Sequence, residues 1–457
     1  IKDSKWPTAG PQGYQVANSC RFNSGSDDHL DKTFAQAGNR RTFTISFWIK
    51  TTVKETYNAI FDAAQDGSNS DDLYFHTNRL NFSGYYGSTQ FALRTTAKFR
   101  DPSAWSHHVI AFDTTQGTAS NRIKFFTNGV QETAFDDETY PSENFQTSYM
   151  NTARLHNIGT LVNNDDFPLD GYLSEFVFID GTALAPDQFG EFDEDSGIWK
   201  PIDVSGLTFG TNGFYLDFKD SANLGNDANG GTDLTEVNLT SIDQSTDTCS
   251  TNFATMNPLD NYYAGSTFSE GNCRVVTGSS PQTWNTSTFG LSSGKWYMEF
   301  TIIDDGSGGS TLIGIADRPT VSASEELGGL ATTYAYLSSG NFRTNNSNTS
   351  NGVSSTDGDI IGVALDLDSA QNTISYYKNN VLIGAAQNIT APVSGSYFIA
   401  SGVWLDADTG TNDHNFGNPV LAHSSSNTDG NGFGSFEYAP PAGYLSINTK
   451  NLAAVLA

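Results

Sequence analysis

The sequence has few cysteines and no long apolar run, and both absences limit what the protein can be. Its 457 residues include three cysteines, Cys20, Cys249 and Cys273. That number is too small for a disulfide scaffold, and because it is odd at least one thiol stays free. No apolar stretch approaches the roughly 20 residues that a membrane-spanning helix needs. The sequence therefore predicts neither a disulfide-rich protein nor insertion in a membrane.

Positive charge is also scarce. Lys and Arg number 23 against 51 Asp and Glu, so the formal net charge is -28. A nucleic-acid backbone would be repelled, and no cluster of Lys and Arg offsets that field, which argues against nucleic acid as a partner. The acidity suits high-salt surroundings, solubility, or divalent cations held by loop carboxylates.

The residues that are plentiful favour strands and tight turns. The chain has 44 Gly, 31 Phe and 19 Tyr, and hydrophobic residues make up 37% of it. Gly, Asn and Ser supply the backbone conformations that turns need, and aromatic residues suit half-buried strands. Sustained helical periodicity is absent. The composition predicts an all-β protein, and the length predicts two or three domains.

Alternation of apolar and polar residues locates the strands of a first sandwich. Residues 42–50 alternate and place four apolar side chains on one face: Phe43, Ile45, Phe47 and Ile49. Residues 105–113 and 122–126 behave similarly, and Asn128-Gly129 is a strong signal for a type I′ hairpin turn. An equivalent strand and Asn379-Asn380 turn recur in the second half of the chain.

These patterns predict two tandem sandwiches joined by a connecting region, since Asp, Asn, Gly and Thr replace apolar residues between them. The predicted parts are an N-terminal arm over 1–13, a first sandwich over 14–192, a connecting region over 193–245, a second sandwich over 246–448, and a C-terminal tail over 449–457.

The first body resembles the laminin G-like branch of the concanavalin A-like lectin superfamily. The matching elements are Ser46-Phe-Trp-Ile49, the strand Trp105–Ile110, the hairpin Phe125–Val130, and Leu169–Ile179 followed by Leu184-Ala-Pro-Asp-Gln188. The resemblance implies a jelly-roll sandwich and leaves its ligand open.

The second body resembles a SPRY domain, a family of protein-recognition modules that bind through loops at one end of a sandwich. The matching elements are Ser293-Gly-Lys-Trp-Tyr-Met-Glu-Phe300, Ile313-Gly-Ile315, Asp357–Asp366, and His414-Asn-Phe-Gly-Asn-Pro-Val420. The fold class expected for the whole chain is therefore all-β, with two tandem concanavalin A-like jelly rolls.

The combination of the two bodies resembles virion structural proteins of tailed bacteriophages, especially marine and cyanobacterial ones. The opening residues 2–10 and the joining segments 191–201 and 252–259 are also similar. The resemblance implies a multi-copy or homo-oligomeric protein on the virion surface, serving as a tail fibre, another appendage or a capsid decoration. Its expected partners are other virion proteins and a host-surface glycan or protein. A secreted bacterial lectin or adhesin and a glycan hydrolase on a lectin fold are the alternatives.

Calcium is the expected cofactor, because two acidic segments offer the hard oxygen ligands that it prefers. The first segment holds Asp66, Asn69, Asp71 and Asp72, and the second holds Asn164, Asp165 and Asp166. In the related pentraxins, calcium ligands come from two loops in the equivalent order. Solvated acidic loops are the alternative. Tyr85 and Tyr86, between two glycines, are candidates for stacking on a sugar ring, and local packing at a hairpin tip is the alternative.

No catalytic residue is predicted. Retaining glucanases of this superfamily carry a pair of glutamates about 5 Å apart. Here Glu191 and Asp193 begin such a pattern, but Asp195 and Ser196 stand where the final glutamate should be. His107 and His108 lie in a predicted strand and point to opposite faces, which favours structural roles. The sequence therefore predicts a binding protein and not an enzyme.

Overall fold

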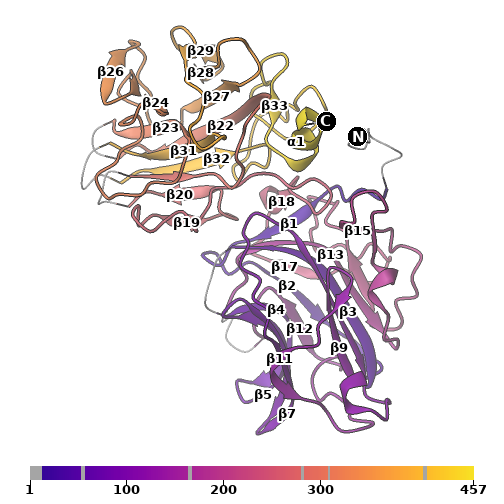
Figure 1. Ribbon diagram of the computed structural model, residues 1–457. Helices are drawn as coiled ribbons and strands as arrows, with labels where there is room; N and C mark the ends of the chain where they lie inside the picture. The colour runs from indigo at the N-terminus through magenta and orange to yellow at the C-terminus, as the bar shows by residue number, and fades with distance from the viewer. Residues whose placement is uncertain are drawn as a thin grey trace, which may run out of the picture. The chain divides into compact units, whose positions relative to one another are not determined.

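A computed structural model describes residues 13–52, 57–162, 167–278, 283–306, 309–404 and 409–456. The chain divides into two compact units, and the boundary lies between Ser250 and Thr251 (Figure 1). Each unit is a pair of β-sheets with an apolar core between them. The predicted all-β fold of two tandem jelly-roll sandwiches is confirmed.

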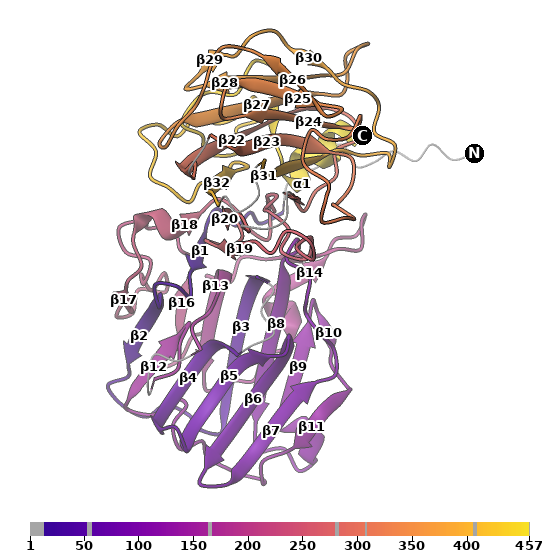
Figure 2. The same cartoon turned by 90° about the vertical axis from the view of Figure 1, so that its left-hand side faces the viewer.

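The first unit contains two antiparallel sheets of eight strands each, and Figure 2 shows the second of them face on. In spatial order the first sheet contains β10 (Val130–Gln131), β9 (Ile123–Thr127), β8 (Ser106–Asp113), β3 (Thr42–Thr51), β13 (Gly171–Asp180), β1 (Ser19–Phe22) and β18 (Gln244–Ser245), with β16 (Phe214–Leu216) also paired to β13. The second contains β11 (Phe135–Thr139), β7 (Thr89–Thr95), β6 (Arg79–Tyr86), β5 (Asn69–His76), β4 (Asn58–Asp66), β12 (Leu155–Ile158), β2 (His29–Thr33) and β17 (Thr235–Val237).

Strand β3 shows how the sequence pattern becomes a core. Its alternating residues Phe43, Ile45, Phe47 and Ile49 are fully buried between the two sheets, as predicted. The opposite face of β3 is buried as well, because the chain after β13 covers it. The small sheet of β14 (Gly190–Phe192) and β15 (Trp199–Pro201) brings Trp199 there, where its Nε1 donates to His107 Nδ1 at 3.0 Å.

The predicted connecting region over 193–245 is wrong, because its strands belong to the first sandwich. Strand β16 pairs with β13, β17 with β2, and β18 with β1. Apolar residues are sparser here, but the region adds six of them to the core of the first sandwich: Phe214, Leu216, Phe218, Leu224, Leu234 and Leu239. Buried ion pairs also hold this region and the residues directly after it. Arg21 donates to Asp243 at 2.9 Å, and Lys50 donates to Asp247 at 2.7 Å, and both pairs are buried.

The second unit contains a nine-stranded and a six-stranded sheet. The first consists of β19 (Thr267–Ser269), β20 (Arg274–Val276), β32 (Thr411–Asn415), β22 (Lys295–Asp304), β27 (Ile360–Asp366), β28 (Thr373–Lys378), β29 (Val381–Leu382), β30 (Gln387–Asn388) and β33 (Leu445–Ser446). The second consists of β21 (Trp284–Thr286), β31 (Phe398–Val403), β23 (Thr311–Ala316), β24 (Thr333–Leu337), β25 (Asn341–Thr344) and β26 (Ser347–Ser350).

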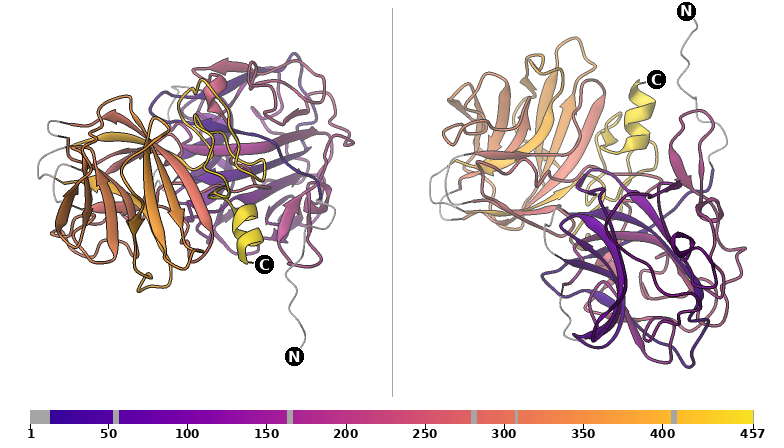
Figure 3. Two further views of the ribbon diagram at one scale, coloured as in Figure 1. Left: turned by 90° about the horizontal axis from the view of Figure 1, so that it is seen from above. Right: turned by 60° about the horizontal axis from the view of Figure 1, so that its bottom comes forward.

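The chain ends in a helix where a tail was predicted. Helix α1 (Thr449–Leu456), yellow in Figure 3, buries Asn451 and packs Leu452 and Val455 against the core of the second unit. The apolar run over residues 452–457 was too short a pattern to indicate a helix from sequence. Among the described residues, no helix is long and apolar enough to cross a membrane.

The two predicted hairpin turns are confirmed. Asn128 and Gly129 have φ angles of 46° and 79°, and Asn379 and Asn380 have 46° and 69°. Two consecutive left-handed residues define the type I′ turn, whose twist matches that of the strands it joins. None of the three cysteines forms a disulfide.

The paired charges predict where the first domain ends. A fragment covering 13–250 should fold cooperatively, whereas one covering 13–192 should not. The shorter fragment loses Asp243 and Asp247, and breaking a buried ion pair costs about 3–5 kcal/mol, against about 5–15 kcal/mol for the stability of a whole domain. Near-ultraviolet circular dichroism and thermal melting of both fragments check this. A cooperative transition in the 13–192 fragment would contradict the boundary.

Candidate recognition sites

The predicted calcium segment over 66–72 is a β-hairpin and not an acidic loop. Asp66 ends β4, Asn69 begins β5, and only two residues separate the strands. The carboxylate of Asp66 accepts hydrogen bonds from the Ser68 backbone N–H at 2.9 Å and from Asn69 Nδ2 at 2.8 Å. These two bonds lower the pKa of Asp66, and they close the turn. The two residues therefore serve the hairpin.

Asp71 lies on the opposite side of the hairpin from Asp72 and is fully buried. It accepts hydrogen bonds from the Tyr86 hydroxyl at 2.6 Å and from the backbone N–H groups of Tyr149 and Met150, both at 2.8 Å. Burial raises the pKa of Asp71 to about 6, although all three hydrogen bonds favour the ionised form. Asp71 therefore holds the segment around Tyr149 against the sandwich.

Asp72 faces away from the core, beside Asp62 on the neighbouring strand β4. Burial, and then the adjacent Asp72, raise the pKa of Asp62 well above its usual range. Asp62 also accepts a hydrogen bond from the Val162 N–H at 2.6 Å. The predicted ligands Asn164, Asp165 and Asp166 lie outside the described residues, so their part in a calcium site stays a prediction.

The four predicted ligands of the first segment do not form one site, because successive residues of a strand point to opposite faces. In the described part of the chain, no three His, Cys, Asp or Glu side chains come close enough together to hold a metal ion.

Asp71 provides a direct test of that correction. Asp71→Asn should lower the melting temperature by the same amount in millimolar calcium and in chelator. Its carboxylate binds protein donors, and losing buried hydrogen bonds to a charged group costs about 1.5–3 kcal/mol. Differential scanning calorimetry in both buffers measures the shift. A decrease that appears only with calcium would return Asp71 to a metal site.

The predicted pair Tyr85 and Tyr86 does not form a two-ring platform. Tyr86 is half-buried, and its ring lies 6.0 Å from Phe145 and 5.2 Å from Tyr149. Tyr85 points to the other face and is 42% exposed. The alternation of a strand separates the two rings, so Tyr85 alone remains available to a ligand.

An aromatic cleft that sequence reasoning missed lies on the same outer face as Asp72. Its cavity of about 100 Å³ is lined by Tyr57, Ala59, Asp72, Tyr74, Leu161 and Phe167. Tyr57 directly precedes β4, and the other lining residues come from β4, β5 and the segment after β12. Tyr57 and Phe167 are 110 positions apart, so only the fold brings their rings to a centroid distance of 4.7 Å. The only local sign of the cleft in the sequence was the spacing of Asp72 and Tyr74, which places both side chains on one face of a strand.

The segment that resembled the start of a glucanase motif has a structural role. Lys200 lies 3.3 Å from Glu191 and 3.1 Å from Asp193, across the β14–β15 hairpin. The Ser196 N–H, followed by Lys200, lowers the pKa of Asp193 to about 2. His107 and His108 face opposite sides of β8 as predicted, and burial lowers the pKa of each to about 3.

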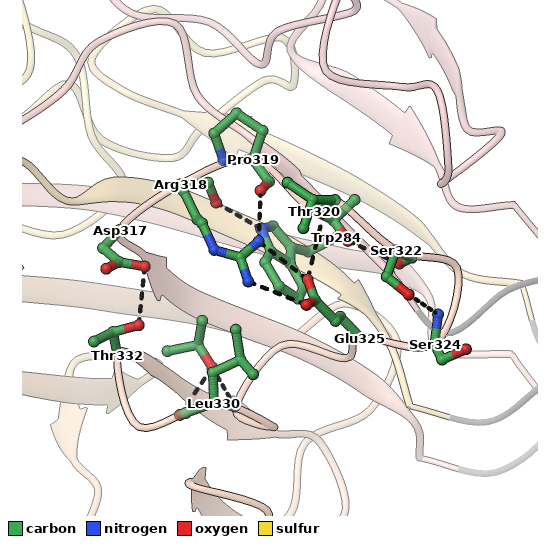
Figure 4. Close-up of polar contacts among 12 residues, drawn as sticks. Trp284, Asp317, Arg318, Pro319, Thr320, Ser322, Ser324, Glu325, Leu330 and Thr332 are labelled. Atoms are coloured by element: carbon green, nitrogen blue, oxygen red, sulfur yellow. Dashed lines mark hydrogen bonds and ion pairs between the residues drawn. The ribbon is translucent and has the colours of Figure 1, made fainter. Parts of the chain in front are cut away.

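A second candidate surface is built from two loops of the second sandwich, residues 317–332 and 390–396. Figure 4 shows that Arg318 and Glu325 face each other, with two contacts of 3.1 Å. Asp317 accepts from Thr332 at 2.9 Å and from the Val393 N–H at 3.2 Å, so it connects the two loops. We call them the paired loops.

The paired loops present apolar side chains to solvent from a hydrogen-bonded framework. Val321 is 59% exposed and Val393 is 84% exposed. Trp284 supports the framework from below, since its Nε1 donates to the Arg318 carbonyl at 3.2 Å. Loops that are ordered before binding lose little entropy when a partner arrives.

A buried glutamate anchors another loop of the second sandwich. Glu299 accepts hydrogen bonds from the N–H groups of Glu437 at 2.9 Å and Tyr438 at 2.8 Å. Burial raises the pKa of Glu299 to about 7. Glu299 belongs to the segment 293–300 that resembles the SPRY signature. The structure gives this glutamate a structural role. The loop that it holds borders a wider cavity of about 580 Å³, which also contains His423.

The raised pKa of Glu299 predicts a pH dependence of stability. The folded form holds a proton that the unfolded form releases near pH 4.5, so the stabilisation is complete below that pH. It falls as pH rises to about 7, by up to about 3 kcal/mol. Glu299→Gln cannot titrate and should lack this contribution. Urea unfolding of both proteins from pH 4.5 to 8 measures it, and identical slopes would contradict the assignment.

Family models match both sandwiches. Residues 24–188 match the concanavalin A-like lectin/glucanases superfamily, and residues 295–403 match the SPRY domain. The fold and the two family matches together define a protein with a lectin-like laminin G domain followed by a SPRY domain. Both are domain types of binding and recognition. A comparison with curated proteins found no match.

Solved structures with similar folds include three of different types. The SPRY domain of human HERC1 is 18% identical, with 35% of this chain and 96% of that chain covered and a TM-score of 0.28. A SAP-like pentraxin from Limulus polyphemus is 16% identical, covering 38% and 82%, with a TM-score of 0.29. Domains LG4-5 of the mouse laminin alpha1 chain are 12% identical, covering 90% and 91%, with a TM-score of 0.31. At these scores the similarities add no argument about function.

Proposed function

We propose that this protein is a non-catalytic recognition protein, displayed in many copies on the surface of a tailed-bacteriophage particle. The paired loops carry the recognition part of the proposal. They join an ordered polar framework to exposed valines, which is the anatomy of a protein-binding patch with an apolar centre and a polar rim. The partner of this surface is a protein, either of the host surface or of the particle.

Several features support a role without catalysis. Glu191 and Asp193 are both within ion-pair distance of Lys200, so neither is poised as a glycosidase acid or nucleophile. The buried histidines of β8 have low pKa values and bond to protein groups. The lectin-like domain fits glycan binding as a second activity of the same particle protein, with Tyr85 as an exposed ring on its surface.

The location on a virion is supported by the sequence resemblance and by charge. A protein of net charge -28 stays soluble at high copy number and is repelled by packaged nucleic acid. Tail fibre, other appendage and capsid decoration are all compatible with a chain of two binding domains.

Substitution of the exposed valines tests the binding surface. Val393→Asp combined with Val321→Asp should weaken binding to host cells or particle proteins at least about tenfold, since two charges would enter an apolar contact. The free energy of unfolding should stay within about 1 kcal/mol of wild type, because both side chains are exposed. Val381→Asp, at an exposed valine outside the paired loops, is the matched control. Equal binding by all three proteins would contradict the proposed surface.

Quantitative mass spectrometry of purified particles tests the location. The chain should occur in a constant, symmetry-determined ratio to the major capsid protein through successive gradients. Its recovery only in the soluble fraction, or release from a bacterial surface in uninfected cells, would favour the secreted adhesin instead.

A further inference from the structure

The aromatic cleft of the first sandwich has a chemistry that the proposed protein-binding surface does not explain. Three aromatic residues and one carboxyl group surround its cavity of about 100 Å³. Tyr57 and Phe167 at its mouth are 38% and 41% exposed. Phe167 also has a φ of 59°, a left-handed conformation that a bulky residue rarely adopts.

The rings are arranged around a shared space. The ring of Tyr57 lies 5.4 Å from that of Tyr74 and 4.7 Å from that of Phe167, with interplanar angles of 31° and 44°. On another side, Tyr57 stacks on His76 at 4.0 Å and 11°, and this contact fixes its orientation. The electron-rich faces of such rings attract cations.

The carboxyl groups beside the cleft lack a compensating charge. Asp62 and Asp72 are cross-strand neighbours, and Asp62 is 1% exposed. The Oδ1 atom of each carboxyl group accepts no hydrogen bond from another described residue. The two carboxyl groups interact with each other through a shared proton. The nearby Arg79 and Arg94 both lie within ion-pair distance of Asp136.

We propose that this cleft binds an alkylammonium group, the end of a lysine side chain or of a free amine. The aromatic faces would surround the methylene and ammonium groups, and Asp72 would accept a charge-assisted hydrogen bond. The net charge of -28 attracts cations to the surface.

Size and ligand type argue against the two main competitors. A cavity of about 150 Å³ holds one benzene ring, so a cleft of about 100 Å³ suits a narrow alkyl chain better than a bulkier six-membered sugar ring. Calcium takes six to eight oxygen ligands, whereas aromatic and aliphatic groups make up most of this wall.

Binding of n-butylammonium to the full chain, in chelator at pH 7, tests the proposal by calorimetry and by chemical shifts of the tyrosine rings. The neutral n-butanol should bind at least about tenfold more weakly, since it lacks the charge. Asp72→Asn and Phe167→Ala should each reduce the affinity at least about tenfold. Phe192→Ala removes a ring that is 51% exposed and lies outside the cleft lining, so it should leave the affinity unchanged. Phe167 is half-exposed, so its variant keeps the test valid if Asp72→Asn fails to fold.

A second arm distinguishes the source of the ammonium group. Nα-acetyl-lysine amide that binds at least as tightly as n-butylammonium indicates a lysine of a partner protein, whereas preference for n-butylammonium indicates a free amine. Equal binding of amine and alcohol would overturn the proposal. A second result would also overturn it: no amine binds, but a methyl glycoside or calcium does, and the Phe167→Ala variant weakens that binding. Because this site is in the first sandwich, its failure leaves the Val321 and Val393 result unaffected.

Discussion

The structure depends on one constraint: a charged side chain that is buried in a sandwich needs a partner of opposite charge or hydrogen-bonding groups beside it. Lys50 illustrates it, since its ammonium group lies buried in the first sheet and donates to Asp247, which also accepts from Trp105. An uncompensated ammonium group at that depth would cost several kcal/mol. The residues that supply the match come from almost two hundred positions later in the chain, so the long segment before Ser250 must fold back onto the domain.

The same constraint organises the loops. Asp71 captures two backbone N–H groups near Tyr149, Glu299 captures two near Tyr438, and Asp317 joins the paired loops. Each is a single acidic side chain that satisfies donors on a distant segment. A buried donor without a partner costs about 1–3 kcal/mol, so these carboxyl groups determine where irregular chain can lie on the sheets. The recognition surfaces proposed above are by-products of that ordering, since a loop held in one conformation presents the same side chains to every partner.

The aromatic cleft is the place where the constraint is least completely met. Asp62 and Asp72 face each other, and each accepts one hydrogen bond at Oδ2, from the Val162 N–H and from the Ser70 hydroxyl, while Oδ1 of each has no described donor. Aromatic rings line the cavity beside Asp72. Functional sites commonly retain such unbalanced groups, because their complement arrives with the ligand. Among the predicted calcium ligands in the first segment, Asp66, Asn69 and Asp71 have structural roles, whereas Asp72 lines the aromatic cleft.

Local pattern alone was sufficient for the strands and turns. Strict alternation in residues 42–50 predicted a buried face correctly, and Asn128-Gly129 predicted its turn, because period-two burial and left-handed turn residues are properties of neighbouring positions. The motifs of both halves also predicted two domain families that the family models match. Pairing of distant segments was decided by the tertiary structure. The strands within 193–245, the separate roles of Asp71 and Asp72, and the meeting of Tyr57 with Phe167 follow from sheet register and from buried charge. These depend on residues far apart in the chain, and an acidic side chain carries no local mark of the partner that it will meet.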